Sequence, residues 1–273
     1  MKSHHVKASI AFVIFLLHAS LGTAAELFIA PAPLGADTNS GTREQPKADV
    51  QQVIWSLKPG DTLTLLPGTY TQTFSFAKSG TAEAPITVRG DASGAVILDG
   101  ATLPAAGVAF SMIAVSANFI TIEGLDIRNS PGWGISVWGK TNAILRGNKI
   151  TGCSWGGIQL ANERPFHGHP NPSADNLIEE NTVVGAKAAL YYGEYQKGGG
   201  LKRTRFERNT FVDGSVELLH LDPSAGHADN VFSDNRCVQT LERPVVNATS
   251  IPPGFHFSNN QWLGLQPPPP FDQ

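Results

Sequence analysis

Short runs in which apolar and polar residues alternate recur along the second half of the chain. Each copy is an apolar run, a small or amide residue, and a second apolar run, and the copies are 119–127, 143–150, 177–184, 205–212 and 231–238. Their middle positions are Gly124, Asn148, Asn181, Asn209, Asn235 and, in a less regular last copy, Asn260. These positions lie 24, 33, 28, 26 and 25 residues apart, and a repeat of this length is typical of a solenoid.

The two-residue alternation excludes the helical solenoids, and each copy is too short for a four-stranded propeller blade. The pattern therefore predicts a single parallel β-helix, an all-β fold in which each copy is one rung. Stacked rungs would place each Asn over the previous one, so that the amides hydrogen-bond in a ladder. The alternative is that Asn merely marks loops, where it is common.

The first third of the chain predicts an end cap. A strand over 27–30 and a turn-rich loop over 35–41 precede a short helix that opens at Pro46 and stops at Pro59. Its apolar face would cover the open end of the coil. We expect a strand and capping helix over 26–60, a coil of about eight rungs over 61–263, and a Pro-rich tail over 264–273.

The same third carries a family resemblance. Its motifs are Phe28-Ile-Ala-Pro31, Pro59-Gly-Asp-Thr62, Leu66-Pro-Gly-Thr-Tyr70, Ala84-Pro-Ile-Thr-Val-Arg89 and Leu98-Asp-Gly100. Together they resemble the opening of secreted right-handed parallel β-helix proteins of the pectin-lyase-like superfamily, most of all family 9 pectate lyases and related polysaccharide lyases. The resemblance implies the right-handed fold strongly. It implies an activity only weakly, because one fold hosts several functions.

Residues 1–25 have the pattern of a secretory signal peptide, with Lys2 and Lys7 before an apolar run that is too short to span a membrane. We therefore expect a secreted or periplasmic monomer with no membrane contact. Removing the two lysines takes the formal charge from -3 to -5, and a mildly acidic chain without a basic cluster argues against nucleic acid as a partner.

The two cysteines outside the signal, Cys153 and Cys237, lie three copies apart. At roughly 4.8 Å per rung they would be about 14 Å apart, which is beyond the reach of a disulfide. We expect two buried free thiols.

Three long connections, 161–175, 193–203 and 221–229, follow equivalent strands and should form one wall of a groove. On the bordering strands, alternation places Ile135, Ile158, Leu190 and Leu218 inward and the sugar-binding candidates outward. The candidates on the strands are Trp138, Gln159, Tyr191 and Glu217. His169, in the first connection, is a further sugar-binding candidate. His220 and His256 also lie on strand-like runs, where we expect them to be packed.

Elimination from an acidic polysaccharide needs a base for the proton beside a carboxylate and a cation that neutralises that carboxylate. Lys197, beside Tyr195 and before three glycines, is the first candidate base, and His167 is a further proton-transfer candidate. Arg164 or Arg203 would hold the carboxylate. The alternative for each is an ordinary solvated loop side chain.

Metal binding has little support from spacing. His167-Gly-His169 has no third ligand at a fixed distance, and calcium through Glu194 or Asp222 is possible without a motif. The Asp-rich calcium cluster of family 9 pectate lyases has no counterpart, since the chain contains no Asp-Asp pair. No catalytic residue of the family can therefore be assigned to a position in this sequence.

These observations favour a secreted, polysaccharide-active protein, with a lyase that cleaves uronic-acid-containing polysaccharide by β-elimination as the first hypothesis. A non-catalytic carbohydrate-binding or surface protein is the second. A glycoside hydrolase that uses two carboxylates from Glu194, Glu217 and Asp222 is the third.

Overall fold

The structure is a computed structural model that describes residues 24–105, 107, 109–166, 169–194, 196, 198–222, 226–247, 252–265, 267 and 269. The predicted signal peptide falls almost entirely outside these residues. In the described part of the chain, no helix has the length and apolar character needed to cross a membrane.

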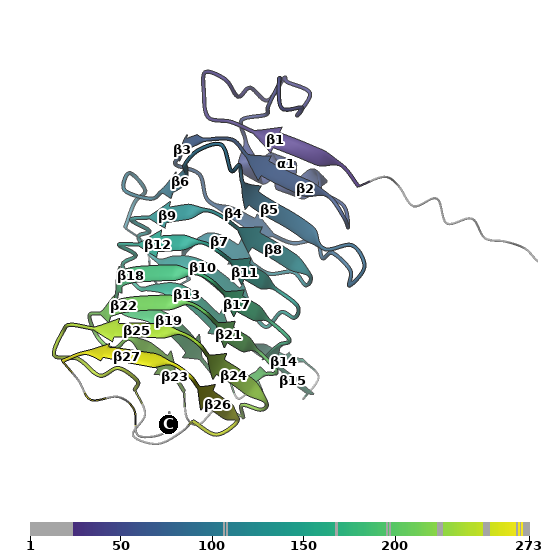
Figure 1. The fold of residues 1–273 in the computed structure, drawn as a ribbon. Helices are drawn as coiled ribbons and strands as arrows, with labels where there is room; N and C mark the ends of the chain where they lie inside the picture. Colours follow the sequence, from purple (N-terminus) through teal and green to yellow (C-terminus); the bar gives the residue numbers. More distant parts are fainter. Residues whose placement is uncertain are drawn as a thin grey trace, which may run out of the picture.

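Three parallel sheets wind around one axis and form a β-helix (Figure 1). The nine-stranded sheet contains β1 (Glu26–Ile29), β2 (Thr62–Leu65), β5 (Ile86–Gly90), β8 (Ile120–Glu123), β11 (Ile144–Arg146), β17 (Leu177–Glu179), β21 (Arg205–Glu207), β24 (Asn230–Ser233) and β26 (Phe255–Ser258). The eight-stranded sheet contains β3 (Gly68–Tyr70), β6 (Val96–Asp99), β9 (Asp126–Arg128), β12 (Lys149–Thr151), β18 (Thr182–Ala186), β22 (Thr210–Gly214), β25 (Arg236–Gln239) and β27 (Gln261–Gly264).

The six-stranded sheet carries the long loops. It contains β4 (Phe74–Phe76), β7 (Ser111–Val115), β10 (Trp133–Trp138), β13 (Gly156–Ala161), β19 (Ala188–Gly193) and β23 (Leu219–Leu221). Two small pairs lie in the loops, β14 (Glu163–Phe166) with β15 (His169–Asn171) and β16 (Ser173–Ala174) with β20 (Leu201–Lys202). The predicted parallel β-helix is confirmed.

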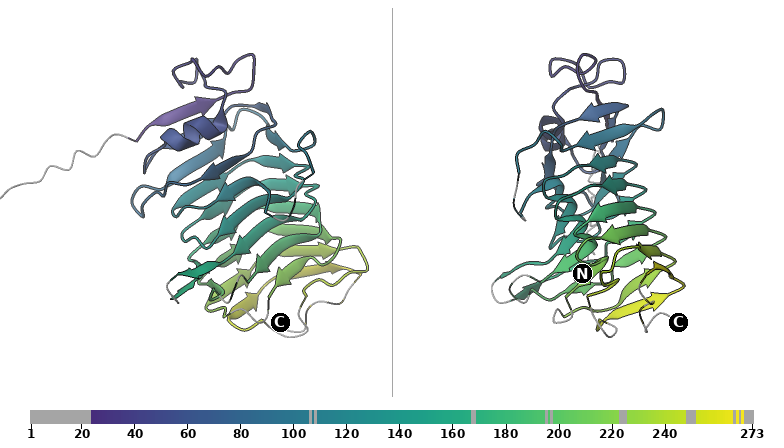
Figure 2. Two further views of the ribbon diagram at one scale, coloured as in Figure 1. Left: turned by 180° about the vertical axis from the view of Figure 1, so that it is seen from behind. Right: turned by 90° about the vertical axis from the view of Figure 1, so that its left-hand side faces the viewer.

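The nine strands of the longest sheet are one more than the eight rungs expected. The reason is that β1 pairs with β2 in parallel and starts the stack, with Glu26 opposite Thr62. Figure 2 shows the rungs stacked from β1 and α1 at one end to β26 and β27 at the other. The core is the column of inward side chains, such as Leu63, Val88 and Ile122, which share one register and are fully buried.

The capping helix α1 spans Val50–Ser56. It begins four residues later than the sequence suggested, because the Asp49 side chain accepts a hydrogen bond from the backbone N–H of Gln52 and so acts as the N-cap. Its apolar residues Val50, Val53 and Ile54 are buried over the coil, as the helical spacing predicted.

The predicted asparagine ladder is confirmed. In each rung the side-chain Nδ2 and the backbone N–H of one Asn both donate to Oδ1 of the next, from Asn148 through Asn181, Asn209 and Asn235 to Asn260, at 2.9–3.0 Å. Nδ2 also donates to a carbonyl in the rung before, for example that of Leu145 from Asn181. The ladder thus satisfies buried turn backbone that would otherwise be unpaired.

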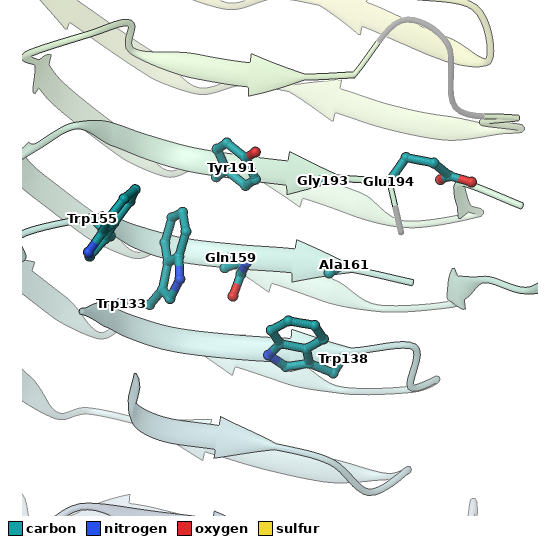
Figure 3. A pocket seen from close by; sticks show the side chains of 8 residues that line it. All are labelled: Trp133, Trp138, Trp155, Gln159, Ala161, Tyr191, Gly193 and Glu194. Carbon is teal, nitrogen blue, oxygen red and sulfur yellow. The ribbon is translucent and has the colours of Figure 1, made fainter. Parts of the chain in front are cut away.

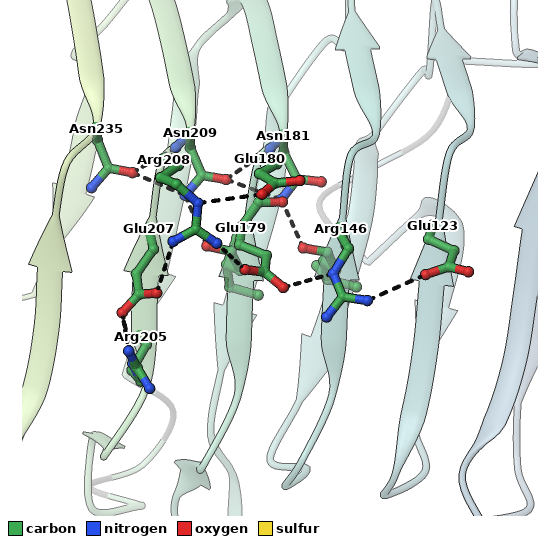
Figure 4. A network of polar contacts seen from close by, with 12 residues as sticks. Glu123, Arg146, Glu179, Glu180, Asn181, Arg205, Glu207, Arg208, Asn209 and Asn235 are labelled. Carbon is green, nitrogen blue, oxygen red and sulfur yellow. Dashed lines mark hydrogen bonds and ion pairs between the residues drawn. The ribbon is translucent and has the colours of Figure 1, made fainter.

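A second ladder, of charged residues, crosses the outer face of the nine-stranded sheet (Figure 4). Arg146 lies between Glu123 and Glu179, at 3.6 and 2.6 Å, and Arg208 pairs with Glu179, Glu180 and Glu207. Its arginines are largely exposed, so each pair contributes little stability in water. The charged side chains of this ladder make this part of the face unsuited to binding the apolar face of a sugar.

Cys153 and Cys237 are both free and buried, as the three-rung separation predicted. Burial raises the pKa of the Cys153 thiol to about 12, so the thiol remains protonated at physiological pH.

Replacing Asn181 by Ala should destabilise the protein by about 2–4 kcal/mol, because the buried donors of Asn148 and the carbonyl of Leu145 lose their partners. Chemical denaturation monitored by circular dichroism measures this change. Asn260→Ala, at the partly exposed end of the ladder, is the matched control and should cost less, since water can replace the lost amide. Equal losses at the two positions would contradict the ladder's role.

Candidate functional site

The outward face of the six-stranded sheet presents one column of polar and aromatic side chains. Ser136, Gln159, Tyr191 and His220 are register partners on β10, β13, β19 and β23. The inward column beside them is Ile135, Ile158, Leu190 and Leu219, all fully buried. The alternation predicted for the first three strands is confirmed.

On the last strand, Leu218 is fully buried as predicted, but the register differs by one residue from the expected one. Leu219, not Leu218, pairs with Leu190, so His220 and not Glu217 occupies the outward column. The reason is that residues 215 and 216 form a bend and β23 begins only at Leu219. The expectation of packing holds for His220, which stacks on Tyr191 on the outward face, and is wrong for His256, which is exposed.

A first hollow of about 270 Å³ lies on this face (Figure 3). It is lined by aromatic rings together with an amide and a carboxylate: Trp133, Trp138, Trp155, Gln159, Ala161, Tyr191, Gly193 and Glu194. Figure 3 shows Trp133 and Tyr191 close to Gln159, with Trp138 one strand away. Gln159 is held by the Ser136 hydroxyl, which donates to its Oε1 at 2.9 Å.

A second hollow of about 230 Å³ adjoins the first and shares Trp133, Trp155 and Tyr191 with it. Its other lining residues are Lys187, Ala188, Val216 and Glu217. The Lys187 ammonium lies 3.6 Å from the centre of the Trp155 ring, a cation–π contact. We call the two hollows together the aromatic groove.

The rings of the groove are held by close packing. Trp133 and Tyr191 contact each other with ring centres 5.0 Å apart. The Trp133 ring lies directly over Gly156, where a β-carbon would come within 2.2 Å of the indole. A glycine at this point of β13 therefore lets the indole lie flat against the sheet.

The Tyr191 ring also stacks against the His220 ring, with ring centres 4.3 Å apart and planes 8° apart. The Nδ1 of His220 is 2.6 Å from Oε1 of Glu217. Burial, and next the charges of Glu217 and Asp222, raise the pKa of Tyr191, so its hydroxyl remains protonated at neutral pH.

The three loops leave consecutive strands β13, β19 and β23. The first loop ends with β16 and the second with β20, and these two strands pair in parallel. A β-bridge between Lys202 and Ala228 links the second loop to the third. This is the stacking predicted from their equivalent positions. Within the first loop, β14 and β15 form an antiparallel hairpin.

The structure does not describe the side chains of several predicted site residues. Lys197, Tyr195 and His167 lie outside the described residues, and Arg164 is described only as part of the β14 backbone. His169 is exposed on β15. These assignments stay predictions.

Arg203 and Glu194 already have partners within the protein. The Arg203 guanidinium makes a two-bond ion pair with Asp175 at 2.7 and 2.8 Å. The Glu194 carboxylate accepts hydrogen bonds from the Tyr192 hydroxyl at 2.7 Å and from two backbone N–H groups, of Gly199 and Gly200. The glycines after Lys197 thus bring the loop onto Glu194.

No three His, Cys, Asp or Glu side chains among the described residues come together in a way that could hold a metal ion. Glu194 and Asp222, the candidate calcium ligands, are therefore not supported by a shared site there. Asp222 instead accepts a hydrogen bond through its backbone carbonyl from Nε2 of His227 at 2.9 Å.

His227 is a buried residue of the third loop. Its Nδ1 accepts a hydrogen bond from the backbone N–H of Leu201 at 3.1 Å, and its ring packs against Tyr192 and Phe255. Burial disfavours the charged imidazolium and lowers the pKa of His227, although the hydrogen bond to the Asp222 carbonyl acts in the opposite direction. It stabilises the loop and does not face the groove.

Sequence reasoning missed Trp133, Trp155 and Lys187 as groove residues, and it missed His220 as the residue that stacks on Tyr191. One signal was available, because a Trp-Gly pair starts two successive rungs, at Trp133-Gly134 and Trp155-Gly156. The backbone N–H of Trp155 donates to the carbonyl of Gly132, so the two tryptophans come from neighbouring rungs.

Comparison with known proteins adds the family context. The sequence profile described as "Pel9A-like, right handed beta helix region" matches residues 28–212, which is more than half of the chain. A pectate lyase, PEL9, of Emericella nidulans is 37% identical over 83 residues, which cover 30% of this chain and 20% of that protein.

Two solved structures share the fold. The pectate lyase Pel9A superposes with a TM-score of 0.63 at 18% identity, and a rhamnogalacturonan lyase with a TM-score of 0.65 at 15% identity. Each alignment covers 89% of this chain but only 62% and 63% of the respective lyase. The chain thus has the β-helix fold of these polysaccharide lyases and spans less than two thirds of their length.

Replacing Gly156 by Ala should displace the Trp133 indole, because the new methyl group and the ring cannot occupy the same space. We expect a changed near-ultraviolet circular dichroism spectrum and a loss of about 1–3 kcal/mol in unfolding free energy. Gly107→Ala, where nothing lies within 4 Å of the added carbon, is the control and should leave both unchanged. An unaltered spectrum for Gly156→Ala would show that the ring is not seated on the glycine.

The lowered pKa of His227 predicts a pH-dependent stability. Below about pH 6.5 the unfolded chain binds a proton that the buried imidazole does not, so the free energy of unfolding should fall as pH falls through this range. His227→Gln should flatten this part of the profile of denaturation midpoint against pH. The exposed His256→Gln should keep the wild-type slope, and identical profiles for wild type and His227→Gln would contradict the assignment.

Proposed function

Because the chain belongs to the Pel9A-like right-handed β-helix family, we propose that it is a secreted protein that binds a uronic-acid-containing polysaccharide in the aromatic groove and cleaves it by β-elimination. The observation that carries this proposal is the groove itself. Four aromatic side chains gather around two adjoining hollows on the sheet that bears the long loops.

The lining matches the surface of a sugar. Pyranose rings have apolar C–H faces and hydroxyl edges, and the partly exposed rings of Trp138, Trp155 and Tyr191 offer apolar surface beside the Gln159 amide. Two adjoining hollows suit neighbouring units of a chain better than one isolated small molecule.

The acidic class of substrate is supported by the relatives and by one cation. The relatives' names, a pectate lyase and a rhamnogalacturonan lyase, concern polymers that contain uronic acid. Lys187 lines the second hollow with its ammonium group above the Trp155 ring. An ammonium in this place would pair with a sugar carboxylate, and that pairing would ease removal of the adjacent proton.

Lys197 and Tyr195, which lie outside the described residues, stay sequence-based candidates for proton transfer. Arg203 is less suited to hold a carboxylate, because Asp175 already occupies its guanidinium. The described carboxylates give the calcium hypothesis no clustered site, so no step of the proposed reaction is assigned to a metal.

The test is incubation of the purified protein with polygalacturonate, rhamnogalacturonan and alginate, with the ultraviolet absorbance of unsaturated uronide as the readout. We expect product from at least one polymer. Trp138→Ala should weaken binding about tenfold through the lost ring contact. Trp55→Ala, on the exposed side of α1, is the matched control and should behave as wild type.

Two results would contradict the proposal. Binding that depends on Trp138 but yields no product would remove the elimination step and support a carbohydrate-binding protein instead. No binding to any acidic polymer would remove the groove as a polysaccharide site.

A further inference from the structure

Tyr191, His220 and Glu217 form a connected set at the aromatic groove, in which Tyr191 and Glu217 line the hollows and the partly exposed His220 links them from beside. Tyr191 lines both hollows, so any sugar chain that occupies them together must pass its side chain. His220 is its register partner on the next strand, about 4.8 Å further along the coil. Glu217 lines the second hollow and holds the imidazole.

The carboxylate defines how the imidazole is protonated. An ionised Glu217 can only accept, so the Nδ1 of His220 carries a hydrogen and donates it across 2.6 Å. In the neutral ring this leaves a lone pair on Nε2. A histidine that is oriented by a carboxylate through one nitrogen can take up a proton through the other, and the carboxylate then stabilises the cation that forms.

Resting on the proposed function, we propose that His220 and Tyr191 are the proton-transfer pair of the elimination reaction and that Glu217 positions His220. Nε2 of His220 takes the proton from the carbon beside the sugar carboxylate. The electron pair of that C–H bond forms the new double bond to the neighbouring carbon, and the bond from that carbon to the glycosidic oxygen breaks. The Tyr191 hydroxyl protonates the leaving oxygen, and water then carries the proton from His220 back to Tyr191.

The local charges support this division of roles. Tyr191 is partly buried and faces Glu217 and Asp222, so its hydroxyl keeps its proton and can act as the donor. The stacked rings hold the two groups one rung apart. Lys187, which lines the same hollow as Glu217, is the cation available for the substrate carboxylate.

His220→Phe separates chemistry from packing, because it keeps an aromatic ring against Tyr191 and removes the nitrogen. On the polymer that the wild type cleaves, we expect kcat to fall at least about 100-fold while KM changes less than about twofold. Tyr191→Phe should likewise lower kcat and retain binding. His256→Phe, on an exposed position of β26, is the matched control and should leave kcat and KM unchanged.

Glu217→Gln tests the positioning role, since the amide is close in shape but has lost the charge. It should lower kcat and leave KM unchanged, and nitrogen NMR of the wild-type imidazole should show hydrogen on Nδ1. A His220→Phe variant that keeps kcat within about tenfold of an active wild type would overturn this inference alone. A wild type that releases no unsaturated product would overturn the proposed function, and this inference with it.

Discussion

The structure depends on the in-register stacking of parallel rungs. Every strand must find its backbone partners in the rungs above and below, and every turn must be satisfied in the same way. The asparagine ladder does this at one corner of the coil, where each amide bonds the backbone of the preceding rung and the side-chain amide of the next Asn. Such stacking fixes which residues of distant parts of the sequence lie side by side.

The aromatic groove is a consequence of this register. Stacking brings Gln159, Tyr191 and His220 into one outward column although they are 32 and 29 residues apart in the sequence. The same register puts a glycine under Trp133, so that the indole can cover the sheet. The three sheets differ in use, because the nine-stranded sheet carries a charged outer ladder whereas the six-stranded sheet carries rings and long loops.

Most of the fold could be predicted from the sequence because the same pattern of apolar and amide residues recurs in successive rungs of a solenoid. The spacing of Asn148, Asn181, Asn209 and Asn235 was enough to predict the ladder, and alternation was enough to predict the inward column. The site was harder. The shift of β23 by one residue depends on a bend that alternation does not reveal, and it makes His220, not Glu217, the register partner of Tyr191. Trp133, Trp155 and Lys187 come together across rungs, and only coordinates show that they share one surface.

The central claim is that the aromatic groove is where a uronic-acid polysaccharide binds. Its most direct test is a crystal structure of the protein soaked with a short acidic oligosaccharide. The account predicts sugar rings lying against Trp138 and Tyr191 on the outward face of the six-stranded sheet, with a carboxylate near Lys187. Sugar bound on another face of the coil, with the groove empty, would contradict it.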